Sequence, residues 1–570
     1  MIASPTRTSL LVCTALLLGA AAPAYPASAA EQPRLVLQIT VDQLRGDQPI
    51  RYAHHFGEGG FRRFMDGGVH YANAHYRHAN TETIVGHTSL ATGAVPAAHG
   101  MVANVWFDRE LGRLVYNIED DRYRLLTVGA DVDDATEIDP TQRVATADGR
   151  SPNAILASTV TDEMAIHFGG ASKLFGVSVK DRGAVAMAGH AGKAFWFSKA
   201  TGEFVTSNYY YDAYPSWVSE WNRSGKVRAY GGRSWELSLP GEAYLFGDRD
   251  DRPYETDFPG FGRTFPHPWG AADDKYFTTR LTLSPAGDEL TLDFAKALID
   301  NEDIGQDDVP DYLSVSFSST DYVGHVFGPS SLEAEDNLVR LDRTLSALLD
   351  FVDERVGLEH TLVVLSADHG GPEAPGYLNE LGMANAHYFD TEAMDRAPAI
   401  ARLKERFGIG EELIERYSHP YVYLNREAIA ERGLDHAEVE EAVAEELGEF
   451  RGIALAVPST ALASNRQADT PLMRSVLNNF NPRRSGDIYV VFAPEVFIND
   501  FDGLVVASTH GSPWRYDTHV PVMFTGFGVK PAVTHRPVTP YDIAATLAAV
   551  LGMKPPSASR GVPLAEVTGD

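Results

Sequence analysis

The chain has 570 residues and a formal net charge of −30 at pH 7, from 48 basic and 78 acidic residues. This acidity argues against nucleic acid or an anionic membrane as the main partner, because both repel a negative surface. A hydrophobic content of 44% is enough for a large core. Length alone allows several domains, but the candidate site residues span nearly the whole chain, so we expect one large domain with insertions.

The first 30 residues have the pattern of a signal peptide. Arg7 precedes the apolar run LLVCTALLLGAAA, and residues 27–29 (ASA) offer a cleavage site. The run is too short to span a bilayer, and no later segment is apolar over about 18 residues. We therefore expect a periplasmic or secreted protein without stable membrane insertion, whose catalytic domain covers 31–566.

Four apolar segments end in polar residues, at 35–42, 174–182, 311–321 and 361–370. Each is typical of a buried parallel strand. Ligands bind at the carboxyl ends of such strands, so four ends predict one shared crevice. Helical patterns at 290–303 and 331–357 lie between them, and a strand–helix pair follows at 518–552. The pattern predicts an α/β fold with a mostly parallel central sheet flanked by helices.

Two stretches are expected to be inserted subdomains. Residues 194–285 are rich in aromatic residues, Gly and Pro and contain hairpin-like segments. Residues 388–480 are acidic and rich in helical patterns, which favours a small α+β unit.

Three aspartates and three histidines lie in short segments typical of metal ligands. They are Asp42, Asp321, His325, Asp368, His369 and His510. The single cysteine, Cys13, falls within the expected signal peptide, so the mature chain has no thiolate ligand. A set of carboxylates and imidazoles suits two Zn²⁺ ions. Taken singly these residues are weak indicators: Asp321 and His325 could be a surface pair, and His510 a structural histidine.

Two threonines, Thr81 and Thr83, precede a segment that is expected to begin a helix. Free N–H groups at a helix N-terminus favour phosphate, so a threonine hydroxyl there is a candidate nucleophile. Zinc coordination would lower the pKa of such a hydroxyl. The residues alone leave open which threonine acts, and a simple helix cap is the alternative.

Lys180 and Arg182 leave the second apolar segment as K-x-R. On an extended segment, side chains at i and i+2 point to the same side. Such a pair is suited to bind the extra negative charge of a phosphate monoester. Two solvent-facing charges are the alternative interpretation.

Other segments are interpreted as ordinary structure. The acidic stretch 131–139 lacks the spacing and the glycine of an EF-hand, so we expect a solvated loop. The stretch 56–61, FGEGGF, has neither the spacing of a nucleotide-binding loop nor a strand before it. His267, Trp269, Trp514 and Tyr516 could line the mouth of the site.

The order of these motifs resembles the alkaline phosphatase superfamily over almost the entire mature chain. The K-x-R is similar to that of its threonine-using, phosphate-irrepressible members. The resemblance implies one Zn²⁺ at Asp42, Asp368 and His369 and a second at Asp321, His325 and His510. It also implies that no third metal binds, because Lys180 would occupy similar space.

The resemblance also implies the roles of the remaining site residues. It places the nucleophile four residues before the histidine of a T-x-x-G-H segment, which selects Thr83 with His87. Asn104 matches an asparagine that contacts phosphate in the threonine-using group.

We therefore expect an exported alkaline phosphatase that hydrolyses small phosphate monoesters through a phosphothreonine intermediate. A phosphodiesterase or nucleotide pyrophosphatase of the same superfamily is the alternative, and K-x-R argues against it. A sulfatase would need a Cys or Ser in place of Thr83. A non-catalytic binding protein would have no need of six ligands and a hydroxyl in this order.

Overall fold

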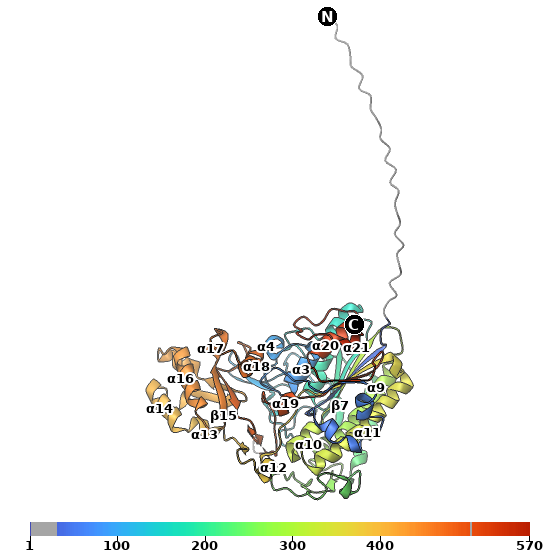
Figure 1. Ribbon diagram of the computed structural model, residues 1–570, viewed down its shortest axis with the longest axis horizontal. Coiled ribbons are helices and arrows are strands. Elements are labelled where there is room, and N and C mark those ends of the chain that lie inside the picture. Colours follow the sequence, from blue (N-terminus) through green and yellow to red (C-terminus); the bar gives the residue numbers. More distant parts are fainter. Residues whose placement is uncertain (2–30, 502–503, 570) are drawn as a thin grey trace. The chain divides into compact units, whose positions relative to one another are not determined.

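A nine-stranded sheet forms the centre of the protein (Figure 1). The computed structural model describes Met1 and residues 31–501 and 504–569, so the expected signal peptide lies outside the described residues. In spatial order the strands are β21 (Ala532–Thr534), β2 (Val69–Tyr71), β20 (Val522–Gly526), β11 (Thr361–Ser366), β1 (Leu35–Val41), β10 (Asp311–Phe317), β5 (Leu174–Ser178), β6 (Lys193–Ser198) and β7 (Glu203–Val205). The five strands from β11 to β6 are parallel, and β20 and β7 pair with them in the antiparallel sense.

The four predicted strands are β1, β5, β10 and β11, and they are neighbours in the sheet. Val41 at the end of β1 pairs with Phe317 at the end of β10, and Thr40 pairs with Ser366 on β11. Their carboxyl ends are therefore level, which confirms the predicted sheet and places the residues after each strand along one edge.

Helices cover both faces of the sheet. Alternate residues of β1, including Leu37 and Ile39, pack in one core with α9 (Pro285–Asn301) and α11 (Leu332–Arg355). Val36 faces the other way, into a core shared with α3 (Thr83–Thr92), α6 (Asp181–Ala188) and α20 (Asp542–Val550). The period-2 alternation of a strand thus gives the three-layer arrangement.

The first expected insertion, 194–285, begins inside the central sheet. Its opening segment forms β6, which pairs in parallel with β5, and the hairpin partner β7. The expectation of a hairpin is correct, but the hairpin extends the sheet because β6 is hydrogen-bonded along β5. The chain leaves the sheet only after Val205, into α7 (Ser216–Arg223) and the short pair β8 (Ser234–Trp235) and β9 (His267–Pro268).

The second expected insertion, 388–480, contributes to a separate four-stranded antiparallel sheet, orange in Figure 1. Its strands are β13 (Ile414–Ser418), β14 (Tyr421–Leu424), β16 (Ile488–Phe492) and β15 (Ile453–Pro458). With α14 (Pro398–Phe407) and α16 (His436–Gly448) they enclose a core of their own. Since β16 lies beyond residue 480, this unit ends later than expected. Among the described residues, no helix combines the length and apolar character needed to span a bilayer.

Candidate active site

The carboxyl edge of the central sheet gathers all six expected metal ligands. Asp42 follows β1, Asp368 and His369 follow β11, and α10 (Ser319–Phe327) after β10 carries Asp321 and His325 one turn apart. His510 comes from the segment before α19 (Arg515–Thr518). The side chains form two groups in which the ligand atoms lie within 4.8 Å of one another: Asp42 with Asp368 and His369, and Asp321 with His325 and His510.

The backbone fixes the orientation of the three histidines. Each has its Nδ1 within 2.8–2.9 Å of a backbone carbonyl oxygen, that of Ser508 for His325, Gly370 for His369 and Thr81 for His510. A carbonyl oxygen only accepts, so Nδ1 carries the proton and a neutral ring has its lone pair at Nε2. These Nε2 atoms face carboxylates: Asp321 Oδ1 is 3.2 Å from His325 and 3.3 Å from His510.

The carboxylates of the two groups are buried and incompletely satisfied. Oδ1 of Asp42 and Oδ1 of Asp321 have no hydrogen-bond partner. Burial raises the pKa of Asp42 well above its usual range, and the Asp368 carboxylate adds to this effect. Buried anions facing imidazole lone pairs are costly unless a cation lies between them. This donor set therefore fits divalent metal ions, and mixed oxygen and nitrogen ligands suit zinc.

Lys180 lies between the two groups. Its Nζ is 2.5 Å from Asp321 Oδ2 and 2.8 Å from Asp42 Oδ2. Although burial opposes protonation, these two carboxylates raise the pKa of Lys180. The lysine therefore neutralises part of the negative charge of both groups.

The expected extended K-x-R conformation is wrong. β5 ends at Ser178, Lys180 caps α6, and Arg182 lies in the first turn of that helix. The Ser178 hydroxyl accepts a hydrogen bond from the Lys180 N–H, which turns the chain into the helix. The two cations consequently diverge, with Lys180 at the carboxylates and Arg182 at Thr83.

Thr83 is the first residue of α3 and meets Arg182. Arg182 Nη2 donates to its Oγ1 at 3.2 Å. The Thr81 hydroxyl instead donates to the backbone carbonyl of Ser512 at 3.0 Å. Only Thr83 of the two thus combines a helix N-terminus with a neighbouring guanidinium.

The T-x-x-G-H segment holds α3 against the end of β11. His87 Nδ1 lies 2.9 Å from Thr83 O and 3.1 Å from Asp368 Oδ2. A Cβ at Gly86 would lie 2.0 Å from the carbonyl oxygen of Asp368, so only glycine permits this approach. The first turns of α3, which begins at Thr83, therefore lie against Asp368 of the Asp42 group.

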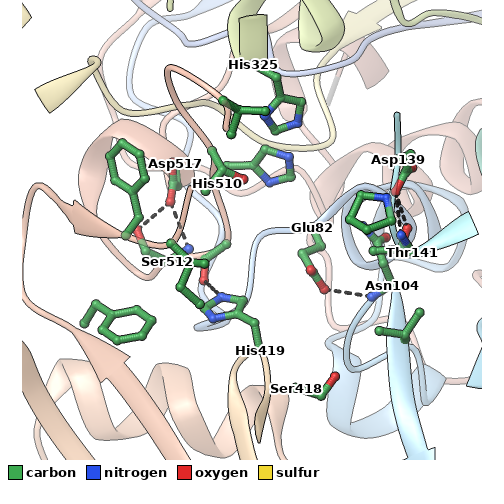
Figure 2. Close-up of a pocket in the computed structure, with 18 of the residues that line it drawn as sticks. Glu82, Asn104, Asp139, Thr141, His325, Ser418, His419, His510, Ser512 and Asp517 are labelled. Atoms are coloured by element: carbon green, nitrogen blue, oxygen red, sulfur yellow. Dashed lines mark hydrogen bonds between the residues drawn. The ribbon is translucent and has the colours of Figure 1, made fainter. Parts of the chain in front are cut away.

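Asn104 lies at the same helix end. Its Oδ1 accepts the Ile84 N–H at 3.2 Å, and its backbone N–H donates to Glu82 Oε2 at 2.7 Å. With Oδ1 engaged, the amide nitrogen of Asn104 is the donor available to a ligand in the cavity that this residue lines (Figure 2).

Sequence reasoning missed a residue that orients Arg182. Arg182 is 3% exposed, and its Nη1 donates to Asp139 Oδ2 at 2.7 Å. The expectation of a solvated loop at 131–139 is wrong for Glu137 and Asp139, which are 7% and 8% exposed. Glu137 pairs with Lys199. The loop is drawn inward because two buried cations need carboxylate partners, and no spacing in the sequence signals this.

Residues 36–513 match the family described as type I phosphodiesterase / nucleotide pyrophosphatase. The chain belongs to this family, within the alkaline phosphatase superfamily.

Curated relatives and a solved structure extend this finding. Alkaline phosphatase PafA of Elizabethkingia meningoseptica is 34% identical over 96% of each chain. A Myroides odoratus protein named calcium-transporting ATPase is 34% identical over 94% of this chain and 95% of its own. Alkaline phosphatase PhoV of Synechococcus elongatus is 33% identical, over 93% and 92%. The crystal structure of PafA superposes with a TM-score of 0.85 at 33% identity, covering 95% of this chain and all of that one. The expected fold and the resemblance to the superfamily, hence to a hydrolase, are confirmed.

The site of this family member opens into a cavity of about 360 Å³. Figure 2 shows His325 and His510 at one end, Glu82 and Asn104 beside it, and His419 at the other end. Of the four residues expected at the mouth, Tyr516 lines the cavity. The other three do not: Trp269 packs in the core with α9, His267 contacts Glu333, and Trp514 Nε1 donates to Phe492 O.

Proposed function

We propose that the protein is an alkaline phosphatase that hydrolyses phosphate monoesters through a phosphothreonine at Thr83. The hydrogen bond from Arg182 to the Thr83 hydroxyl carries this proposal. A guanidinium beside the nucleophile can form charge-assisted hydrogen bonds to the phosphate oxygens that a monoester leaves ionised. The names of PafA and PhoV support the same activity.

The residues divide the work as follows. One zinc ion would be held by Asp42, Asp368 and His369, and the other by Asp321, His325 and His510. When bound, the two ions would supply positive charge and lower the pKa of the nucleophile. Arg182 and the Asn104 amide donate to phosphate oxygens, together with the N-terminus of α3.

In the first step Thr83 Oγ1 bonds to phosphorus while the bond from phosphorus to the ester oxygen breaks, and the alcohol departs with a proton in place of the one that the Thr83 hydroxyl gives up. In the second step water attacks the phosphothreonine, which releases inorganic phosphate and restores the hydroxyl. Lys180 holds two of the buried carboxylates in place throughout.

A solved variant of PafA gives independent support for this set. It carries substitutions of one threonine, one asparagine, one lysine and one arginine. The threonine and asparagine have the same separation as Thr83 and Asn104, and the lysine and arginine the same as Lys180 and Arg182.

The family description favours a second candidate, a phosphodiesterase or nucleotide pyrophosphatase. A diester has one ionised oxygen fewer and an additional group on phosphorus. The buried guanidinium of Arg182 would then lack one acceptor. We therefore place diester hydrolysis second.

Initial rates on phenyl phosphate and on methyl phenyl phosphate decide between the two candidates. We expect the monoester to be much faster in the native protein. Arg182→Ala should lower kcat/KM for the monoester about 10- to 100-fold, because a charge-assisted hydrogen bond contributes about 1.5–3 kcal/mol. The diester should change little. Equal losses on both substrates would show that Arg182 only positions the site. Lys180 is left intact because it contacts Asp42 and Asp321.

The nucleophile is tested with matched threonine variants. Thr83→Ala should lower turnover by several orders of magnitude, whereas Thr83→Ser should retain a good part of it. Thr81→Ala is the control and should retain turnover. A phosphoryl label trapped at low pH on Thr81 would overturn the assignment.

We also propose that the protein is exported, because residues 2–30 have the sequence pattern of a signal peptide. N-terminal sequencing of the native protein should give a start near residue 31. A native start at Met1 would contradict export through a cleaved signal peptide.

A further inference from the structure

Beyond Arg182 and Asn104, apolar side chains dominate the cavity wall. They come from separate parts of the chain: the hairpin of β3 (Val105–Asp108) and β4 (Arg113–Tyr116), the loop before Asp139, the end of β13, and the segment around β17 (Val496–Phe497). Representative side chains are Val105, Leu114, Ile138, Tyr417, Ile498 and Leu504. The small four-stranded sheet thus supplies one wall of the active-site cavity.

The same wall offers little to a charged group. Among the described residues that line the cavity, Arg182 is the one lysine or arginine. The acidic side chains there are Glu82, Asp139, Asp321 and Asp517. They accept hydrogen bonds from protein groups, such as the Asn104 N–H at Glu82 and the Ser512 N–H at Asp517. A second anionic group on a substrate would therefore meet carboxylates and no free cation.

The apolar wall is held rigidly against the catalytic end. The His419 ring stacks on Phe492 with centroids 6.0 Å apart and an interplanar angle of 6°. His419 Nε2 lies 2.9 Å from the carbonyl oxygen of Gly511, next to His510. The small sheet is thus joined directly to the segment that carries a candidate metal ligand, and the cavity is preformed.

We propose that this end of the cavity is a leaving-group subsite for monoesters of uncharged, apolar alcohols, including aromatic ones. The inference rests on the proposed function and adds a substrate class to it. Apolar surface of the departing alcohol is removed from water against the wall, whereas a charged alcohol loses hydration without gaining a partner.

Three substrates with phenols of nearly equal acidity isolate the subsite: phenyl phosphate, 4-propylphenyl phosphate and 4-(2-carboxyethyl)phenyl phosphate. Since the chemical step is equally demanding in all three, the ratios of kcat/KM report contacts with the leaving group. We expect the propyl compound to exceed phenyl phosphate about 3- to 30-fold, from partial burial of three carbons. The carboxyethyl compound should be about threefold slower or more at low salt.

Paired variants on one hairpin provide the control. Leu114 lines the cavity, whereas Leu111 lies at the tip of the same hairpin and is 61% exposed. Leu114→Lys should reduce the propyl preference and raise the relative rate on the carboxyethyl compound about threefold or more. Leu111→Lys should leave both ratios unchanged.

Equal rates on the three substrates, or equal shifts in both variants, would overturn the subsite. A folded, zinc-loaded protein that hydrolyses none of the three would instead contradict the proposed phosphatase function. The two failures are therefore distinguishable.

Discussion

Asp139 fixes the plane of the guanidinium that meets Thr83, the proposed nucleophile. Nη1 of Arg182 donates to Asp139, while Nη2 donates to Thr83. Although burial opposes ionisation of Asp139, the Arg182 guanidinium and the Thr141 hydroxyl lower its pKa below the usual range. Because the guanidinium is planar, fixing one of its terminal nitrogens also fixes the direction in which the other one donates.

The first prediction concerns this carboxylate. Asp139→Asn keeps the size of the side chain but removes its charge, so Arg182 should be held less firmly. We expect kcat/KM for phenyl phosphate to fall about 10-fold, as for the loss of a charge-assisted contact, with less effect on the diester. Asp134→Asn, in the exposed part of the same loop, is the control and should change neither rate. An equal fall on both esters would mean that Asp139 only stabilises the fold.

At the residue scale, the sequence predicts the candidate metal ligands better than the residues that orient the other side chains of the site. Asp42, Asp368 and Asp321 could be selected because polar residues end apolar strands, and the structure groups them as expected. Asp139 could not be selected in this way, because its partner Arg182 lies 43 positions away and is reached only when the loop folds inward. The expected orientation of Lys180 is wrong for a related reason. Helix α6 begins earlier than the strand pattern of the sequence indicates, so Lys180 and Arg182 do not lie on one extended segment.

At the element scale, Gly511 joins the His510 segment to the small sheet. Its φ of +115° lies where side chains are rarely tolerated, and a Cβ would come within 2.8 Å of His419 Nε2. The neighbouring His510 binds the carbonyl of Thr81 through Nδ1. Displacement of Gly511 therefore moves a candidate ligand.

We predict that Gly511→Ala lowers kcat/KM by at least about 10-fold and weakens zinc retention. Gly528→Ala is the matched control, because Gly528 has φ +67° and nothing within 4 Å of a built Cβ. Both variants should lose roughly 1 kcal/mol or more of stability from the backbone conformation. Loss of activity in both variants alike would refute the link through His419. Unfolding midpoints, rates and bound zinc are the measurements.

His436, at the start of α16, gives the small sheet a pH-dependent contact. Its Nε2 lies 3.2 Å from Asp487 Oδ1, and hydrogen bonds to Asp487 and Glu440 raise the pKa of His436 to about 9. The pKa of His436 in the folded state lies above its unfolded value of about 6.5. The contact therefore stabilises the folded state fully below about pH 6.5, and this stabilisation is lost as the pH rises through 9.

The Tm of the native protein should therefore exceed that of His436→Gln at pH 6, and the difference should vanish by about pH 10. His167→Gln, at an exposed position of α5 (Val160–His167), is the control and should show no such trend. A difference that persists unchanged at pH 10 would assign the effect to packing.

For the whole molecule, the two candidate metal groups gather buried carboxylates at one edge of the central sheet. The two groups bring three aspartates into a buried site with Lys180 as their cation. Because a ligand that binds only the folded state stabilises it, metal binding should contribute to stability as well as to catalysis.

We predict that chelation abolishes activity and lowers Tm by several degrees, and that zinc restores both. The double variant Asp42→Asn and Asp321→Asn should lose activity, but its Tm should respond less to chelator, because fewer anions are left facing one another. Full activity in the presence of chelator, together with no zinc in the purified protein by elemental analysis, would contradict the two-metal proposal.

The arrangement of layers was accessible from the sequence, whereas the edges of the inserted units were not. Apolar runs such as 361–366 are long enough to indicate buried strands, and level strand ends follow from parallel pairing. The hairpin of β6 and β7 has the same composition whether it stands alone or extends a sheet. Only its hydrogen bonds to β5 distinguish the two cases.

The contact between His510 and Thr81 spans 429 positions of the chain. A polypeptide still on the ribosome holds Thr83 and Arg182 but lacks His510, the last candidate ligand of the second group. If His510 is a metal ligand as proposed, such a chain would be catalytically silent, since the site closes only when nearly all of the protein has been made and folded. On the proposed mechanism, phosphatase activity would therefore begin only where folding finishes.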